Sequence, residues 1–263
     1  MTAPVALTIA GSDSSGGAGI QADLRTFAAF GVHGASVVTA LTAQDAERVH
    51  AVAEVAPAFV VQQLDAVLDD LEVHAAKTGM LHRTGVIDVL VARFRSRPLP
   101  HLVVDPVMVA TSGDTLLEPA GIAALRERLL PLATLVTPNL HEAEVLTERA
   151  VTDLAGMRAA ARALVALGAR AALVKGGHLA GDAVDVLYDG HGFRELRAAR
   201  SEGRRLHGTG CVLSAAITAG LALGKGLGDA VADAKRHITR VVELAPEVGR
   251  SSRRMPIAPK HRA

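Results

Sequence analysis

A glycine-rich string, His207-Gly208-Thr209-Gly210-Cys211, stands directly before a long apolar run that we predict to be a helix. Glycines let consecutive backbone N–H groups point to one side, and the N-terminal end of a helix adds partial positive charge. This arrangement suits a bound phosphate, or the negative charge that develops while a phosphoryl group is transferred. Gly208, Thr209 and Gly210 are therefore candidates for an anion hole. The alternative is a packed glycine turn in which Thr209 caps the helix.

Cys211 is the only cysteine of the chain, and it stands where the predicted helix begins. A buried cysteine is usually a small inert apolar residue. The N-terminus of a helix, however, lowers the pKa of a thiol below its ordinary value of about 8.5. A thiolate at this position can accept the proton of a substrate alcohol as the alcohol attacks phosphorus. We predict that Cys211 is a catalytic residue with a lowered pKa.

Three charged residues follow or open regular elements and could handle a nucleotide: Asp105, Glu142 and Lys175. Asn139 and Glu142 have the spacing of a capping box, which explains both residues without any function. The alternative is that Glu142 and Asp105 surround a hydrated Mg²⁺, which keeps several waters and needs few protein carboxylates. Lys175 ends an apolar strand, and it either extends its ammonium to solvent or contacts the phosphates of ATP.

Two other polar residues, Asp23 and Gln44, are candidates for recognising a heteroaromatic ring. Asp23 falls in the first turns of a predicted helix, where an acidic residue is favoured by the helix dipole in any case. A carboxamide offers a donor and an acceptor together, so Gln44 with a carboxylate could bind an aminopyrimidine edge. Sequence patterning leaves both interpretations of Asp23 open.

Two nucleotide-binding fingerprints fit this sequence poorly. The string 17–22 formally matches G-x-G-x-x-A, but Gly11–Gly16 separate it from the preceding strand, where the fingerprint requires a tight turn. Gly224-Lys225 is followed by Gly226, so a Walker P-loop is absent. An NAD-dependent oxidoreductase is therefore only a distant alternative.

The elements that must position these residues alternate between strand-type and helix-type runs. Apolar strands flanked by helical patterns predict a mainly parallel sheet with helices on both faces, as a single α/β domain over residues 1–248. The expected strands are 5–10, 35–41, 49–55, 73–77, 102–105, 135–137, 171–175 and 184–188. The expected helices are 20–30, 58–71, 84–94, 119–129, 141–146, 153–167, 211–223 and 229–244.

The candidate residues fall where ligands bind in such folds, beyond the carboxyl ends of the strands. Six predicted strands are followed by glycine-rich or polar residues, at 11–19, 44, 78–80, 105–107, 138–142 and 176–178. We expect these segments to meet along one edge of the sheet.

Composition limits the classes of function. No apolar run approaches the roughly 18 residues of a membrane span, and Met1–Ala3 leads directly into a strand-like run, so a cytoplasmic protein without a signal peptide is expected. Five basic and no acidic residues lie in 250–263; the rest of the chain carries 23 basic and 27 acidic side chains. No basic face for nucleic acid is therefore indicated. The tail, 249–263, is expected to be disordered.

Taken together, the segments resemble the ribokinase-like superfamily, and specifically its hydroxymethylpyrimidine kinase branch. The resemblance covers about Val5 to Leu244. The strings that carry it are Ala6-Leu7-Thr8-Ile9-Ala10-Gly11-Ser12-Asp13, Ser15-Gly16-Gly17-Ala18-Gly19-Ile20-Gln21-Ala22-Asp23, Thr39-Ala40-Leu41-Thr42-Ala43-Gln44, Lys77-Thr78-Gly79-Met80, Val104-Asp105-Pro106-Val107-Met108, Thr137-Pro138-Asn139-Leu140, Val174-Lys175-Gly176-Gly177-His178 and His207-Gly208-Thr209-Gly210-Cys211.

The resemblance implies a three-layer α/β/α fold, a homodimer, and phosphorylation of a pyrimidine alcohol and then of its monophosphate, each from MgATP. It implies that Cys211 is catalytic, at a position where many superfamily members carry an aspartate, and that Gly208, Thr209 and Gly210 form the anion hole. Substrate residues would be Gly11, Asp23, Gln44, Met80 and Val107. Lys175, Thr209 and Asn139 would bind ATP, and Asp105 and Glu142 would lie near magnesium.

The chain departs from this family pattern in three places: Thr111 replaces a usual lysine, Gly203-Arg204-Arg205-Leu206 replaces a usual Thr-Lys-Asn-Thr, and the basic tail replaces a Gly/His-rich end. Arg204 or Arg205 could restore the lost positive charge. Pyridoxal kinase and hydroxyethylthiazole kinase are alternatives within the superfamily. A non-catalytic pyrimidine sensor is the alternative outside the enzymes.

Overall fold

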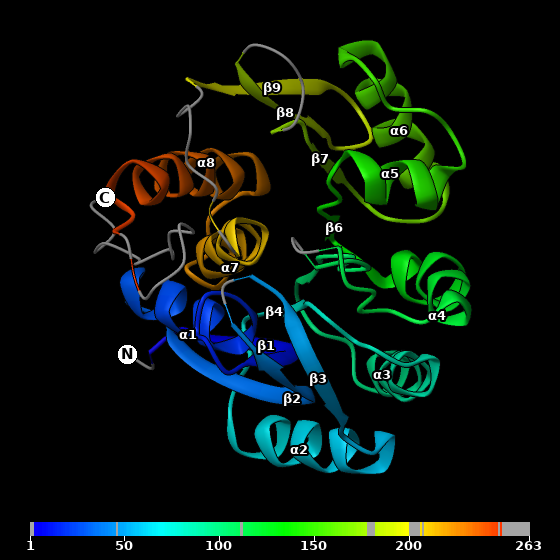
Figure 1. The fold of residues 1–263 in the computed structure, drawn as a ribbon, viewed down its shortest axis with the longest axis vertical. Coiled ribbons are helices and arrows are strands. Elements are labelled where there is room, and N and C mark those ends of the chain that lie inside the picture. Colours follow the sequence, from blue (N-terminus) through cyan, green and yellow to red (C-terminus); the bar gives the residue numbers. More distant parts are fainter. Residues whose placement is uncertain are drawn as a thin grey trace.

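The computed structural model describes residues 3–45, 47–110, 113–177, 182–199, 206, 208–246 and 248. These residues form one nine-stranded sheet with the order β3-β2-β1-β4-β5-β6-β7-β8-β9 (Figure 1). The six adjacent strands β2, β1, β4, β5, β6 and β7 are parallel to one another. Antiparallel pairs occur only at the two edges of this sheet, where β3 pairs with β2, and where β8 pairs with β7 and β9. The strands are β1 Val5–Asp13, β2 His33–Gln44, β3 Val49–Glu54, β4 Ala75–Thr78, β5 Leu102–Val104, β6 Leu135–Val136, β7 Ala172–Lys175, β8 Ala183–Tyr188 and β9 Phe193–Ala198.

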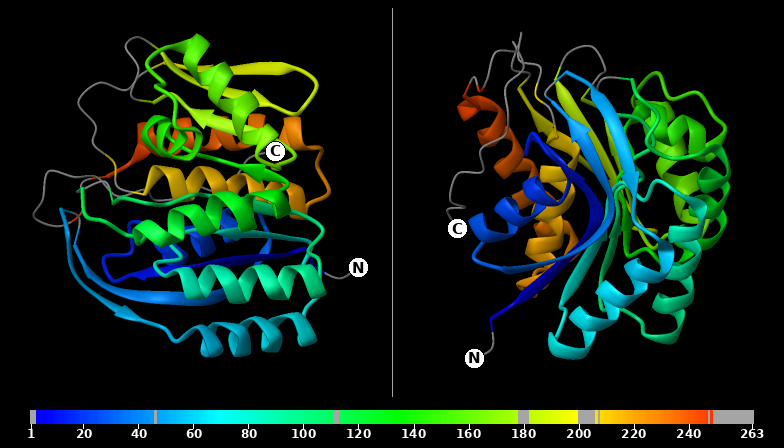
Figure 2. Two further views of the ribbon diagram at one scale, coloured as in Figure 1. Left: turned by 90° about the vertical axis from the view of Figure 1, so that its right-hand side faces the viewer. Right: turned by 60° about the horizontal axis from the view of Figure 1, so that its bottom comes forward.

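Helices cover both faces of the sheet, so the predicted three-layer α/β/α sandwich is confirmed (Figure 2). One face carries α1 Gly19–Ala29, α7 Thr209–Ala222 and α8 Leu227–Leu244. The other face carries α2 Pro57–Asp70, α3 Thr84–Ser96, α4 Pro119–Ala124, α5 Leu140–Thr147 and α6 Leu154–Ala166. None of the helices in the described part of the chain is long and apolar enough to cross a membrane.

The sheet separates two apolar cores because successive strand residues point to opposite faces. Val103 and Leu135 belong to the core beneath α1, α7 and α8, whereas Val104 and Val136 belong to the core beneath the other helices. All four side chains are almost fully buried. Both sides of the central strands therefore gain from apolar burial, which explains their uninterrupted apolar sequences.

Helix α7 lies in the middle of its layer and is buried from Val212 to Ala222. It packs against α8 at close range, because a Cβ placed on Gly220 would lie 2.9 Å from the Cβ of Ala230. Tight packing on every side fixes the position of the first turn of α7, which carries Thr209, Gly210 and Cys211.

The predicted elements are found, with several differences in their bounds and one added strand. Strand β1 extends to Asp13 rather than ending at Ala10, because its pairing with β2 continues past a register shift. Strand β9, a charged edge strand, is not among the predicted strands. The helix predicted over 119–129 is regular only to Ala124 and continues as a π turn, Leu125–Leu129. Thr111, 178, 203–205, 207 and the tail 249–263 lie outside the described residues.

Candidate active site

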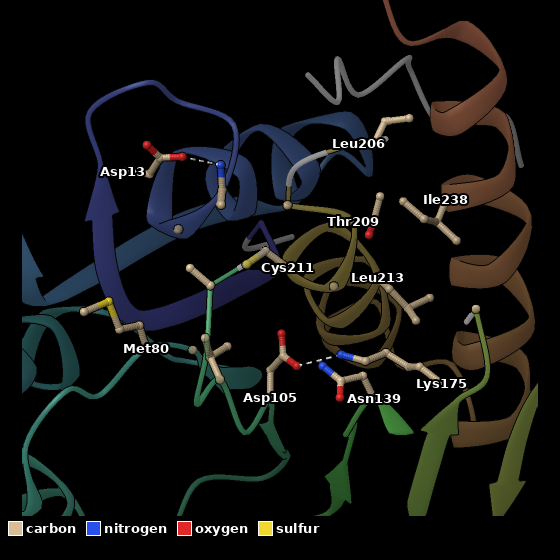
Figure 3. Close-up of a pocket in the computed structure, with 18 of the residues that line it drawn as sticks. Asp13, Met80, Asp105, Asn139, Lys175, Leu206, Thr209, Cys211, Leu213 and Ile238 are labelled. Carbon is tan, nitrogen blue, oxygen red and sulfur yellow. Dashed lines mark hydrogen bonds and ion pairs between the residues drawn. The ribbon is translucent and has the colours of Figure 1, made fainter. Parts of the chain in front are cut away.

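A cavity of about 440 Å³ opens at the carboxyl ends of the parallel strands, where the sequence placed the candidate residues (Figure 3). Asp23 is the only sequence-predicted site residue that does not line it. The predicted residues that line the cavity are Gly11, Gln44, Met80, Asp105, Val107, Asn139, Glu142, Lys175, Gly208, Thr209, Gly210 and Cys211. Segments that follow most strands of the sheet therefore line one cavity.

One end of the cavity combines apolar walls with an amide. Met80 and Val107 line this end together with Leu116. Gln44, the last residue of β2, lies in the same wall, and the hydroxyl of Thr42 donates to its Oε1 at 3.1 Å. Space is tight, since a Cβ on Gly11 would lie 3.0 Å from the Sδ of Met80. A narrow apolar slot with one oriented amide suits a flat polar ring.

The glycine string forms the start of α7, and its shape depends on the absence of side chains. Gly208 is the N-cap with φ 79°, and a Cβ placed on it would lie 2.0 Å from the carbonyl oxygen of Gly17. The alternative in which Thr209 caps the helix is wrong, because Thr209 is already helical and the cap is Gly208. The first-turn N–H groups of a helix have no partners within the helix, so this end of α7 is suited to an anion.

Lys175 brings a positive charge to the same place. Its Nζ lies 3.0 Å from Oδ1 of Asp105 and 3.2 Å from where a Cβ of Gly210 would be. Ser214 of α7 donates to Oδ2 of Asp105 at 3.0 Å, and Thr137 donates to Oδ1 at 3.2 Å. Burial would raise the pKa of Asp105, but the nearby lysine charges outweigh burial and hold it below its usual range. Asp105 is therefore a carboxylate that fixes Lys175 beside the start of α7.

Glu142 caps the start of α5 and also lines the cavity. The capping box expected from the sequence is confirmed: the Asn139 amide N–H donates to Glu142 Oε2 at 2.7 Å, and the Glu142 N–H donates to Asn139 Oδ1 at 2.9 Å. Burial raises the pKa of Glu142 to about 7, against the opposing effect of Lys175. A cation placed beside a carboxyl group with so high a pKa would favour its ionised form.

This raised pKa predicts that Glu142 makes the ligand-free protein less stable as the pH rises. The folded-state pKa lies above the unfolded value of about 4.3, so the folded state binds the proton of Glu142 more tightly than the unfolded state does. Protonation of Glu142 therefore stabilises the fold fully below about pH 4, and this stabilisation is lost as the pH rises to about 7. We expect the free energy of unfolding of wild type, relative to Glu142→Gln, to fall by about 1–3 kcal/mol across that window. Urea unfolding of both proteins at several pH values measures it; parallel curves would contradict the prediction.

Cys211 lies at the centre of the cavity wall, at the start of α7 (Figure 3). The predicted lowering of its pKa is wrong, because its pKa is raised to about 11. Burial is the main cause, and the carboxylates of Asp23 and Asp105 add to it. Lys77 and the backbone N–H of Gly19 act in the opposite direction but do not compensate. Low dielectric surroundings thus outweigh the helix terminus in the ligand-free protein.

The prediction that Asp23 lines the substrate pocket is wrong. Its carboxylate is completely buried beneath the cavity, where Oδ1 accepts from Lys77 Nζ at 2.8 Å and Oδ2 accepts from the Thr8 hydroxyl at 2.6 Å. Both side chains of the Asp23–Lys77 ion pair are fully buried. Burial raises the pKa of Asp23, while for Lys77 burial is outweighed by Asp23, Cys211 and Asp105, which raise its pKa.

A protein-family model described as phosphomethylpyrimidine kinase matches residues 13–256. The chain belongs to this family. The hydroxymethylpyrimidine/phosphomethylpyrimidine kinase of Rhizobium meliloti is 52% identical over 267 residues, which span 100% of this chain and 98% of that protein. Family membership confirms the resemblance found in the sequence, and it makes the chain a kinase, a phosphotransferase.

Two solved structures place the phosphomethylpyrimidine kinase fold among the ribokinase-like vitamin kinases, as expected. The phosphomethylpyrimidine kinase of Clostridium difficile is 42% identical, covers 90% of this chain and 99% of its own, and superposes with a TM-score of 0.81. The pyridoxal kinase of Bacillus subtilis, solved as an ADP complex, is 39% identical, covers 94% and 95%, and has a TM-score of 0.89.

The opposite end of the cavity in this family member contains none of the site residues predicted from the sequence. Apolar residues from the segment before α7, from α7 and from α8 form that end, together with Thr239 and Lys235. The apolar members are Leu206, Leu213, Ile238 and Val242, and the first three are labelled in Figure 3. No motif marks them, because a helix face that borders a cavity has the same amphipathic pattern as one that packs on a core.

Proposed function

We propose that this chain phosphorylates the hydroxymethyl group of 4-amino-5-hydroxymethyl-2-methylpyrimidine, and then the resulting monophosphate, with ATP as donor, in thiamine biosynthesis. One observation carries the proposal: a single cavity joins the Gln44 slot, the start of α7 with Lys175, and a second apolar end. An acceptor ring, a phosphate chain and a nucleobase would occupy these three parts in that order. The printed names of the relatives support the same assignment.

In the proposed reaction, the hydroxyl oxygen of the pyrimidine attacks the γ-phosphorus of ATP, and the bond from that phosphorus to the β,γ-bridging oxygen breaks to release ADP. The hydroxyl proton passes to Sγ of Cys211 in its thiolate form, which becomes the neutral thiol. The first-turn amides of α7 and the Lys175 ammonium stabilise the charge on the transferring group, which is the main task in phosphoryl transfer. In the second step a phosphate oxygen of the monophosphate is the nucleophile.

The donor set fits a magnesium ion carried by the nucleotide rather than a metal held by the protein alone. Among the described residues, no three His, Cys, Asp or Glu side chains gather into a metal cluster. Asp105 and Glu142 are neighbouring buried carboxylates, and the charge of Asp105 lowers the tendency of Glu142 to ionise. Mg²⁺ keeps most of its waters and binds through few carboxylates plus phosphates. We assign Asp105 and Glu142 to that role, in which the ion would neutralise phosphate charge.

A homodimer completes the proposal and rests on the resemblance to the family. The cytoplasmic location and the single kinase domain over residues 1–248 are proposed from the composition and the strand–helix pattern of the sequence. No role is proposed for nucleic acid or membrane.

The test is incubation of the purified protein with MgATP and either the hydroxymethylpyrimidine or pyridoxal, with products followed by mass spectrometry. Pyrimidine diphosphate is expected. Pyridoxal phosphate as the main product would transfer the assignment to pyridoxal kinase, the alternative that the Bacillus subtilis structure favours. Binding of the pyrimidine without any product would overturn the enzyme assignment and favour a sensor. A monophosphate alone would restrict the proposal to its first step.

A further inference from the structure

His82 has an unusual backbone conformation beside the substrate end of the cavity. Among the described residues other than glycine, only His82 and Glu148 have positive φ, at 65° and 55°. Glu148 caps the end of α5, where a left-handed residue is common. His82 lies in the loop between β4 and α3, two residues after Met80. Left-handed non-glycine residues persist where surrounding contacts fix them, and they concentrate at functional sites.

The contacts that fix His82 form a clamp on the segment before α4. Its ring Nδ1 lies 3.1 Å from the carbonyl oxygen of Leu116. A carbonyl only accepts, so Nδ1 carries the hydrogen and donates it. The carbonyl oxygen of His82 in turn accepts from the N–H of Glu118 at 3.2 Å. One residue therefore holds the chain on both sides of Leu117.

The clamped segment forms a wall of the substrate end. Leu116 lines the cavity and packs with Met80 and Ala40 in one apolar cluster, against which Val107 also packs. On its other side the segment is held by Met108, whose carbonyl oxygen accepts from the N–H groups of Leu116 and Leu117 at 2.8 and 3.2 Å. Leu116 is thus suspended between the Met108 carbonyl and the His82 ring.

We propose that His82 is a positioning residue for the kinase reaction: its Nδ1–H bond to Leu116 fixes the apolar wall against which the acceptor ring packs. This inference rests on the proposed function, because it names the substrate end by the acceptor ring. The nucleobase end is built from Leu206, Leu213 and α8. Loss of the clamp should therefore weaken binding of the acceptor and leave binding of ATP unchanged.

Three substitutions separate the hydrogen bond from the backbone conformation. Asparagine tolerates positive φ and carries an amide nitrogen the same number of bonds from the backbone as Nδ1. Aspartate has the same shape but, when ionised, no donor. Glycine adopts positive φ freely and also lacks a donor. We expect His82→Asp and His82→Gly to raise the KM of the hydroxymethylpyrimidine about tenfold, and His82→Asn to stay within about twofold of wild type. The KM of ATP should stay within about twofold in all three.

Equal defects in His82→Asn and His82→Asp would overturn the proposal, and so would a parallel rise in the KM of ATP. Hydrogen exchange of the ligand-free proteins supplies a second measurement that needs no substrate. The amides of Leu116, Leu117 and Glu118 should exchange faster in the Asp and Gly variants than in wild type or His82→Asn. Equal exchange in all four proteins would overturn the clamp. A wild-type protein that phosphorylates no ring substrate would instead overturn the proposed function, and this outcome is distinguishable from the exchange result.

Discussion

Replacement of Cys211 by alanine is expected to lower kcat/KM for the pyrimidine alcohol by roughly a hundredfold or more, because a proton acceptor at the reacting oxygen is lost. Serine at this position should be nearly as defective, since a hydroxyl group is a far poorer proton acceptor than a thiolate. Aspartate should restore part of the activity, because a carboxylate can accept the proton. Coupled detection of ADP measures all four proteins, and circular dichroism confirms that the variants are folded.

The pH dependence of these proteins tests the same role. The thiol pKa is about 11 in the ligand-free protein. Below that pH, the thiolate fraction therefore increases about tenfold for each unit by which the pH rises. Because kcat/KM reports the free enzyme, its logarithm should increase with a slope near one between about pH 6 and pH 9 in wild type. Cys211→Asp should show a much flatter profile over the upper part of this range. A flat wild-type profile, or an active alanine variant, would exclude Cys211 as the proton acceptor.

Replacement of Lys77 by methionine is expected to reduce the free energy of unfolding by about 3–5 kcal/mol. Lys77 and Asp23 are both completely buried and pair at 2.8 Å, so the substitution leaves an uncompensated carboxylate in the core. Urea unfolding followed by circular dichroism measures the loss. If the pair acts as a unit, the double variant Lys77→Met with Asp23→Asn should lose clearly less than the single variant, and a double-mutant cycle gives the coupling.

A second lysine provides the matched control. Lys225 pairs with Asp233, but about a third of its side chain is exposed, at 32%. Solvent screens such a pair, so Lys225→Met should cost under about 1 kcal/mol. Similar losses in Lys77→Met and Lys225→Met would contradict the importance that we attach to complete burial.

The order of elements and the location of the site could be predicted from the sequence because both depend on local patterns. Uninterrupted apolar runs marked the central strands, and glycine or polar residues immediately after them marked the strand ends. Strand β9 was missed for the opposite reason. Its sequence, Phe193–Ala198, mixes Arg and Glu with apolar residues, because it lies at the edge of the sheet and pairs with β8 alone.

Errors at the site arose where the environment depends on contacts between distant segments. Asp23 had the expected position near the start of α1, but its partner Lys77 comes from β4, 54 residues away. Local sequence cannot show that these two residues are buried together. The predicted direction of the Cys211 pKa shift was wrong for the same reason. The helix terminus is a local feature, whereas burial and the carboxylates around the sulfur come from the packing of several elements.

The position of the single cysteine allows intact sites to be counted by thiol labelling. Because Cys211 is the only thiol in the chain and lies in the cavity wall, a thiol-selective reagent has one group to react with, and that group is in the site. The moles of label bound per mole of chain therefore count the intact sites in a preparation. The reaction should be slow at neutral pH, where the high pKa keeps the sulfur protonated.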